Sequence, residues 1–142
     1  MANLQRAIEI AVEAHKNQVD KGGRPYILHP LRLMFRMQND EERMAAVLHD
    51  TVEDTPITLD DLRGEGFPDV VVEAVDRLSR RSTESYEEFV ARAAEHPLAR
   101  RVKLADIEDN LDIRRLREIQ DRDLVRLRRY HAVWKGLAEP EA

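Results

Sequence analysis

Apolar residues recur every three or four positions along nearly the whole chain, which is the spacing of amphipathic helices. In the first such segment, Leu4, Ile8 and Ala11 share one face, because side chains three or four residues apart lie above one another on a helix. His15 continues that face. No segment shows the sustained alternation of a half-buried strand. The pattern therefore predicts an all-α fold.

Capping and helix-breaking residues divide this pattern into separate helices. Asn39 followed by Glu42 has the spacing of a capping box, and it predicts a helix over residues 40–54 that ends before Pro56. Two further pairs, Thr58 with Asp61 and Ser85 with Glu88, repeat that spacing. A first helix is expected from near Leu4 to a stop before the 20–25 loop, and another from Thr58 to a close at Gly64 and Gly66. The other expected helices cover about residues 30–37, 68–80, 85–96, 98–116 and 122–137.

Composition is that of a helix-rich globular protein. The 142 residues are 42% apolar and 36% charged, with five Gly and six Pro. There is no repeat, low-complexity tract or linker, so we expect a single domain over residues 1–142. The absence of cysteine excludes disulfides, cysteine-bound zinc and a cysteine nucleophile. Any metal would be bound by imidazole and carboxylate groups.

The charge and the N-terminus bear on partners and location. The first residues are charged and amphipathic, and no apolar run is long enough to span a bilayer, so we expect a cytoplasmic protein without a membrane partner. The net charge is −5, although residues 98–135 hold 11 basic against 7 acidic side chains. A duplex-binding domain would be basic overall, so we expect no nucleic-acid partner. We interpret the mixed charges of residues 98–135 as a solvated helix face.

The strongest chemical signal is the cluster His49, Asp50, Glu53 and Asp54. On a continuous helix these side chains fall within one arc of about 140°. Three carboxylates that close repel one another unless a positive charge lies among them, and a divalent cation would supply it. The alternative is a solvent-facing acidic helix end with an incidental histidine. Acidic residues at a helix C-terminus oppose the macrodipole, so local stability does not explain the cluster.

A second candidate is the segment that contains Asp106 and Asn110, which lie four residues apart and so on one helix face. Asp106 follows the apolar residues Leu104 and Ala105, where an unpaired carboxylate would be costly. It therefore requires a cationic partner, either a metal ion or, in a purely structural interpretation, Lys103.

His29 is the third candidate, since it lies at a loop-to-helix junction after a glycine-rich turn. Together with His49, Asp50 and Asp106 it completes a set of two imidazoles and two carboxylates. Mixed nitrogen and oxygen ligands without sulfur suit Mn²⁺, Fe²⁺ or Zn²⁺ better than Mg²⁺ or Ca²⁺. We interpret the other histidines as structural or surface residues: His15, His96 and His131.

Three motifs in this order resemble the hydrolase domain of RelA/SpoT-type alarmone enzymes and their small single-domain relatives, within the HD superfamily. The likeness spans about residues 4–137. The matching segments are Lys21-Gly22-Gly23-Arg24-Pro25-Tyr26-Ile27-Leu28-His29-Pro30, Ala45-Ala46-Val47-Leu48-His49-Asp50-Thr51-Val52-Glu53-Asp54-Thr55, and Val102-Lys103-Leu104-Ala105-Asp106 with Asn110.

The resemblance implies an all-α, single HD-type helical domain that binds Mn²⁺ as its cofactor. It implies that the metal ligands are His29, His49, Asp50 and Asp106. It also implies that Glu53 and Asp54 handle the attacking water, and that Asn110 and Lys21 contact the nucleotide. The family reaction removes the 3′-pyrophosphate from guanosine tetra- or pentaphosphate. In our interpretation Lys21 and Arg24, with Arg77 or Arg80, neutralise phosphate charge.

The chain departs from the family pattern at two places. The family usually has Arg-Lys-Ser where this chain has Asp20-Lys21-Gly22, and Met-Arg-Thr where it has Leu111-Asp112-Ile113. Two expected positive charges thus become negative. We therefore expect weakened hydrolysis of guanosine tetraphosphate, and an Asp20→Arg change that improves its affinity.

Three alternatives to this function remain. The first is an HD phosphohydrolase that acts on another phosphorylated nucleotide. The second is a non-catalytic nucleotide-binding sensor, although Glu53 and Asp54 are intact. The third is a purely structural helical module.

Overall fold

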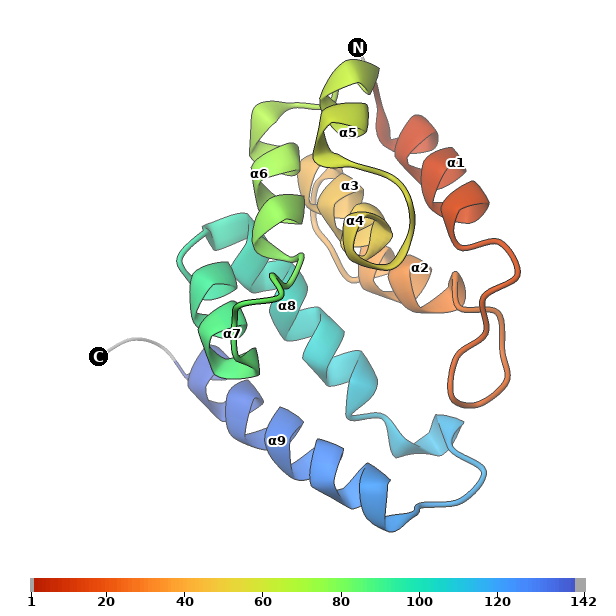
Figure 1. Cartoon of the computed structure of the whole chain (residues 1–142), viewed down its shortest axis with the longest axis vertical. Helices are drawn as coiled ribbons and strands as arrows, with labels where there is room; N and C mark the ends of the chain where they lie inside the picture. The colour runs from red at the N-terminus through yellow and green to blue at the C-terminus, as the bar shows by residue number, and fades with distance from the viewer. Residues whose placement is uncertain (1, 140–142) are drawn as a thin grey trace.

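The computed structural model describes residues 2–139, which form an all-α fold (Figure 1). The described residues contain no strand, only an isolated bridge between Val19 and Pro25. The predicted all-α class is confirmed. The elements are α1 (Leu4–Ala14), α2 (Leu28–Phe35), α3 (Asp40–Leu48), α4 (Thr51–Asp54), α5 (Leu59–Glu65), α6 (Asp69–Arg77), α7 (Tyr86–Ala94), α8 (Pro97–Asn110), the 3₁₀ helix η1 (Ile113–Arg115) and α9 (Asp121–Ala138).

Helix α3 lies at the centre of the fold, because it packs against α1, α2, α6 and α8. Its residues from Met44 to Leu48 are all buried and form the middle of the main hydrophobic core. A smaller apolar cluster, which contains Val90, Ile107 and Leu137, joins α7, α8 and α9. Helix α9 runs alongside α8 (Figure 1). These two clusters fix the helices on which the candidate residues lie.

The capping spacings predicted most helix starts. Thr58 with Asp61 and Ser85 with Glu88 form complete capping boxes. Asn39 accepts a hydrogen bond from the Glu42 amide, but the Glu42 carboxylate accepts from Gln38 and not from Asn39. The capping box predicted at Asn39 is therefore only half formed.

Two predicted helices were too long. Residues 40–54 form α3 and α4 with an interruption at His49 and Asp50, so the continuous 140° arc is wrong. Residues 98–116 were predicted as one helix, whereas α8 ends at Asn110 and a 3₁₀ turn follows. The side chain of Asp112 caps this turn by accepting a hydrogen bond from the Arg114 amide.

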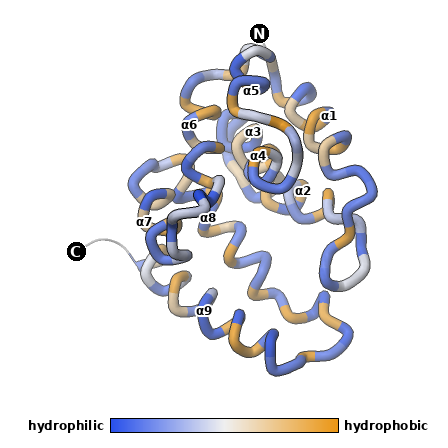
Figure 2. Tube along the Cα trace, viewed as in Figure 1, coloured by the Kyte–Doolittle hydropathy of each residue, from blue (hydrophilic) through white to orange (hydrophobic). Residues whose placement is uncertain are grey.

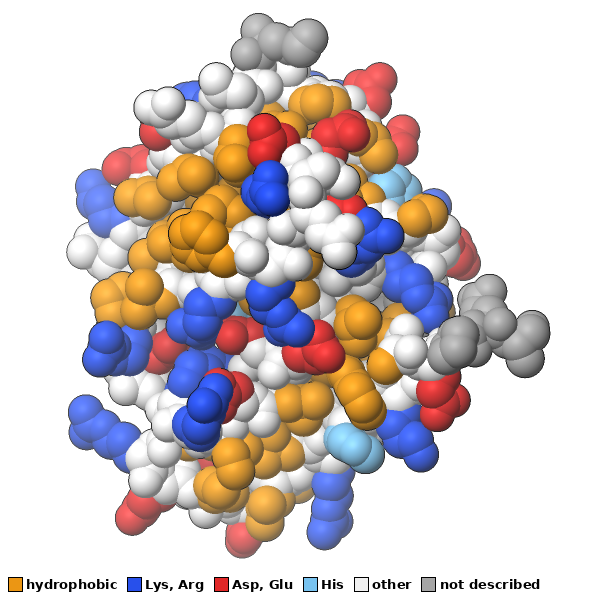
Figure 3. Space-filling model, turned by 180° about the vertical axis from the view of Figure 1, so that it is seen from behind, with side chains coloured by type: hydrophobic (Ala, Val, Ile, Leu, Met, Phe, Trp, Pro, Cys, Tyr) orange, Lys and Arg blue, Asp and Glu red, His pale blue; other side chains and the backbone are white. Residues whose placement is uncertain are grey.

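Polar and apolar side chains are interspersed along the chain and over its surface. Hydrophobic residues recur along the trace of each helix (Figure 2), and no helix within residues 2–139 is long and apolar enough to cross a bilayer. On the face seen in Figure 3, basic and acidic side chains alternate with apolar ones, so that face carries no field of a single sign.

The two glycines near the end of α5 predict opposite responses to substitution. Gly66 has a left-handed φ of 88°, where a Cβ is disfavoured, so Gly66→Ala should destabilise the protein by about 1 kcal/mol. Gly64 lies inside the helix, and a Cβ there meets nothing within 4 Å. Gly64→Ala should therefore stabilise it by about 0.5–1 kcal/mol. Urea unfolding of both variants measures the difference, and an equal response would contradict the conformational assignment.

Candidate functional site

The loop that precedes α2 is held in shape by its own backbone and by Asp20. The Asp20 amide donates to the Arg24 carbonyl, and the Asp20 carbonyl accepts from the Gly23 amide. The Oδ1 atom of Asp20 accepts from the amides of Gly22 and Arg24 at 2.8 and 2.9 Å. Gly23 adopts a positive φ of 78° within this turn. Tyr26, at the end of this loop, lines a cavity of about 600 Å³. Helix α2 begins one residue before His29.

The interruption between α3 and α4 presents Asp50 to the same cavity, and His49 lies buried beside it. His49 keeps helical φ and ψ, whereas Asp50, at φ −102° and ψ −2°, departs from them, and the amide of His49 donates to the Ala46 carbonyl in a tight turn. The hydroxyl of Thr51 donates to the carbonyl of Leu48 at 2.7 Å. The Tyr26 hydroxyl donates a hydrogen bond to Asp50 Oδ2 from across the cavity. This contact fixes the direction of the Asp50 carboxylate.

Three of the four predicted metal ligands, His29, His49 and Asp50, offer donor atoms that all lie within 4.8 Å of one another. Asp106 lies outside this mutually close group but contacts both rings. Its Oδ1 is 2.9 Å from His29 Nε2 and 3.7 Å from His49 Nε2. These four side chains come from α2, α8 and the α3–α4 junction. His29, Asp50 and Asp106 line the cavity of about 600 Å³, whereas His49 does not line it and is buried beside them.

A contact at Nδ1, on the side away from the cluster, sets the orientation of each imidazole. His49 Nδ1 lies 2.7 Å from the carbonyl of Ala46, which can only accept, so this nitrogen carries the proton. His29 Nδ1 lies 2.6 Å from Asp109 Oδ2. In both residues Nε2 is therefore the atom that faces the cluster. Such an arrangement is typical of histidines that bind metal ions.

His49 Nε2 is buried and has no hydrogen-bond partner among residues 2–139. Asp50 Oδ2 lies 3.0 Å from it, yet the two atoms are not aligned for a hydrogen bond. A buried polar atom without a partner is costly, and such groups are rare in folded proteins. A cation among these atoms would satisfy this nitrogen and both carboxylates, so the residues present fit a divalent metal ion.

Without a metal the cluster is balanced by protons and by Lys103. Burial lowers the pKa of His29, but hydrogen bonds to Asp106 and Asp109 outweigh burial and leave that pKa above its ordinary value. Burial likewise opposes the charge on His49, yet Asp50 and Asp106 hold the pKa of His49 well above its ordinary value. Metal binding would displace these protons.

Lys103 is the structural partner considered for Asp106. Its Nζ lies 2.9 Å from Asp106 Oδ2 and 4.6 Å from the centre of the Phe89 ring. Burial raises the pKa of Asp106, but Lys103 and the two histidines hold it well below its ordinary value. Lys103 thus occupies one carboxylate oxygen and leaves Oδ1 directed at the imidazoles.

Glu53 and Asp54 lie on α4 at the rim of the same cavity. Glu53 accepts a hydrogen bond from the backbone amide of Arg80. Partial burial and the charges of Asp50 and Glu53 raise the pKa of Asp54 to about 6. The cluster predicted from residues 49–54 is therefore brought together, although by two short helices and not by one.

The predicted nucleotide-binding residues divide into two groups. Lys21 and Asn110 line the cavity, and the Asn110 amide donates to Asp106 Oδ1 at 3.1 Å. Arg80 also lines it. Arg24 is exposed at the loop tip and does not line the cavity, and Arg77 instead donates to Glu95. Arg24 and Arg77 therefore lie outside the lining of this cavity.

Sequence reasoning missed Asp109 and Arg32. The guanidinium of Arg32 donates to both oxygens of Asp109 at 2.8 and 2.9 Å, and Asp109 in turn accepts from His29. Arg32 follows His29 by three residues, and Asp109 follows Asp106 by three. This matched spacing on two helices was a signal that could have identified the pair.

The remaining histidines lie outside the cluster. His15 is buried, and its Nδ1 lies 2.9 Å from the side-chain oxygen of Gln18. His96 caps α8 by accepting from the Ala99 amide. His131 is exposed and stacks on Trp134.

Comparison with known proteins finds a matching family model and similar proteins whose names agree with one another. A family model described as "HD domain" matches residues 7–129. The chain is 34% identical over 120 residues to a protein of Aquifex aeolicus named guanosine-3′,5′-bis(diphosphate) 3′-pyrophosphohydrolase. It is 32% identical over 122 residues to the bifunctional (p)ppGpp synthase/hydrolase SpoT of Escherichia coli. Both alignments cover 76% of this chain but only 17% of the relative, so the chain spans about a sixth of their length.

A solved structure is also similar. It comes from work titled "A metazoan ortholog of SpoT hydrolyzes ppGpp and plays a role in starvation responses". The TM-score is 0.81 at 24% identity, and the match covers 98% of this chain and 87% of that one. This likeness shows the fold.

The contact between Asp109 and His29 generates a prediction for the metal-free protein. Asp109→Asn keeps an oxygen that can accept from His29 Nδ1 but removes the negative charge, so the pKa of His29 should fall. Because the folded-state pKa of His29 is raised, its protonation stabilises the fold below about pH 6.5, and this contribution is lost as pH rises through the folded-state pKa. The variant should therefore lose most stability on the acidic side. NMR titration of the imidazole nitrogens measures the pKa.

Asp112→Asn is the matched control, since Asp112 follows α8 but pairs with Arg114 and not with His29. An unchanged His29 titration in Asp109→Asn would contradict the assigned role of Asp109.

Proposed function

This chain belongs to the HD domain family, and on that premise we propose that it is a metal-dependent phosphohydrolase that removes pyrophosphate from guanosine 3′,5′-bis(diphosphate) or a similar phosphorylated nucleotide. The names of its relatives support the reaction class. The observation that carries the proposal is the buried Nε2 of His49, which has no hydrogen bond among the described residues and lies 3.0 Å from Asp50 and 3.7 Å from Asp106.

The proposed metal ligands are His29, His49, Asp50 and Asp106. Two nitrogen and two oxygen donors favour a transition ion, and we propose Mn²⁺. When bound, such an ion would lower the pKa of a water molecule and polarise a phosphoryl oxygen. Lys103 and Tyr26 hold the two carboxylates in position, and Asp109 holds His29, so the ligand directions are set before any ion arrives.

Proton transfer falls to Glu53 and Asp54 in this proposal. A general acid–base group works best when its pKa lies near the working pH, and in the metal-free protein the pKa of Asp54 is about 6. Glu53 is directed by the Arg80 amide and would orient the attacking water. Lys21 and Asn110, which line the same cavity, would contact the nucleotide.

The alternative is a phosphohydrolase of another phosphorylated nucleotide. It is favoured by Asp112, which lines the cavity where the family usually has an arginine. A panel of phosphorylated nucleotides incubated with the Mn²⁺-supplied protein separates the two, with release of phosphate and pyrophosphate measured individually. Pyrophosphate release from guanosine tetraphosphate supports the first function, and turnover confined to other nucleotides supports the alternative. If no nucleotide of the panel is hydrolysed, the proposal that this protein is a phosphohydrolase is wrong.

The metal assignment predicts about one ion per chain. Protein purified without chelator and supplied with Mn²⁺ should retain a stoichiometric ion, and His49→Ala or Asp106→Ala should abolish binding, because the remaining carboxylates then repel one another without a complete ligand set. Elemental analysis and calorimetry measure this. His131→Ala, an exposed histidine outside the cluster, should bind normally. Absence of stoichiometric metal in the unsubstituted protein would sink the assignment.

Glu53→Gln should show that Glu53 acts in catalysis and not in metal binding. We expect the variant to keep its metal and its melting temperature but to lose about 10²-fold or more in turnover, the usual contribution of a positioned acid or base. Glu41→Gln, an exposed glutamate in the first turn of α3, is the control and should retain full turnover. An equally active Glu53→Gln enzyme would move the proton-transfer role to Asp54.

A further inference from the structure

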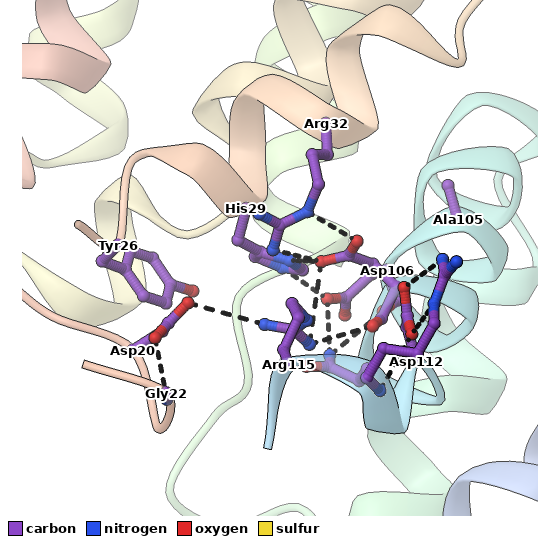
Figure 4. Close-up of polar contacts among 12 residues, drawn as sticks. Asp20, Gly22, Tyr26, His29, Arg32, Ala105, Asp106, Asp112 and Arg115 are labelled. Carbon is purple, nitrogen blue, oxygen red and sulfur yellow. Dashed lines mark hydrogen bonds and ion pairs between the residues drawn. The ribbon is translucent and has the colours of Figure 1, made fainter. Parts of the chain in front are cut away.

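The loop before α2 packs directly against the 3₁₀ turn η1, two segments that are far apart in sequence (Figure 4). Gly22 permits this contact, because a Cβ at that position would lie 2.6 Å from the carbonyl oxygen of Arg115. Such a distance is too short for any side chain against backbone. The glycine that departs from the family pattern thus brings the loop against Arg115.

Asp20 also departs from the family pattern, and both of its carboxylate oxygens have partners. Its Oδ1 accepts from two loop amides, and its Oδ2 lies 3.6 Å from Arg115 Nη1. The side chain is only 8% exposed. The carboxylate therefore does not project freely into the cavity, as the sequence comparison had assumed. It holds the loop and faces an arginine that comes from the opposite wall.

Arg115 lies between Asp20 and the candidate metal cluster and lines the same cavity (Figure 4). Its Nη2 donates to the Asp109 carbonyl at 2.9 Å. Asp109 Oδ2, 3.9 Å from Nη2, accepts from His29. Among the described residues no hydrogen bond involves Nη1 of Arg115. The guanidinium is thus one carboxylate away from a proposed ligand, and its Nη1 faces Asp20 in an ion pair without a hydrogen bond.

The contact with Asp109 does not by itself account for Arg115. Arg32 already donates to both carboxylate oxygens of Asp109, so that charge is neutralised without a second arginine. Lys21 and Arg126 line the same part of the cavity, and burial together with the charges of Arg126 and other nearby cations lowers the pKa of Lys21. Three cations, Lys21, Arg115 and Arg126, thus reach the cavity from separate elements, and each of the two arginines has an aspartate beside it, Asp20 and Asp123 respectively.

We propose that Arg115 binds a phosphate group of the substrate, and that Asp20 and Gly22 position it for that purpose. A guanidinium presents paired donors that match phosphate oxygens, and its charge lies near the candidate metal cluster. The arginine that the family usually has at position 20 is thus replaced by one from η1, and Asp20 becomes its support. This inference rests on the proposed function for the reaction, but its ligand chemistry is tested separately.

The test uses inorganic pyrophosphate as the probe and the Mn²⁺-supplied full chain. Calorimetry should show that Arg115→Ala weakens pyrophosphate binding about 10- to 100-fold, the usual effect of losing a charge-assisted contact, while Mn²⁺ affinity is unchanged. Arg115→Lys should recover part of the loss. Arg114→Ala is the matched control: this neighbour is 87% exposed, pairs with Asp112 and does not line the cavity, so binding should be unaltered.

Asp20→Arg gives a second, opposite outcome. If Asp20 positions Arg115, the new arginine removes the loop acceptor and repels Arg115, so pyrophosphate binding weakens. If Asp20 is merely a misplaced negative charge, binding improves, most strongly at low salt. Improved binding in Asp20→Arg, unchanged binding in Arg115→Ala, loss of Mn²⁺ affinity in Arg115→Ala, or no pyrophosphate binding by the unsubstituted protein would each overturn the proposal.

These outcomes are distinct from failure of the proposed function. If no nucleotide of the panel is hydrolysed and pyrophosphate binding still depends on Arg115, the phosphate site stands and the hydrolase is wrong. If turnover is normal but pyrophosphate binding is indifferent to Arg115, the hydrolase stands and this site is wrong.

Discussion

The structure depends on how ionisable side chains are buried at the junction of α2, α8 and the α3–α4 break. His29, His49 and Asp106 are each less than 10% exposed, where an unpaired charge would be costly. Each has a fixed partner on the side away from the cluster: Asp109, the Ala46 carbonyl and Lys103, respectively. The supports leave one set of donor atoms facing inward, and that remainder needs positive charge from protons or from a metal.

This constraint explains why the supporting residues matter as much as the cluster itself. Arg32 and Asp109 each follow a cluster residue by three positions, so two facing helices present matched pairs. Tyr26 reaches Asp50 from the loop before α2. The same loop carries Asp20 to Arg115. The loop, α2, α8 and η1 therefore act as one unit around the cavity, and a change in any one of them alters the charges that the others meet.

Departures from a family pattern have to be interpreted in pairs. Asp20 and Gly22, taken singly, suggested a lost positive charge and a lost hydroxyl. In the structure both contact Arg115, which no motif had identified. The sequence could not show this, because η1 lies about 90 residues from the loop and nothing in the local pattern links them.

Local sequence by itself determined the helical class and several helix starts, because capping boxes and amphipathic spacing act over four to seven residues. It also determined the candidate residues, since imidazoles and clustered carboxylates beside apolar positions need a partner wherever they fold. Only the tertiary structure decided where the helix from Asp40 breaks. Asp50, at φ −102° and ψ −2°, interrupts the helix, although no glycine or proline in the sequence marks that position. It also decided which partner each buried charge finds, because these partners lie on other helices and only packing brings them within hydrogen-bonding distance.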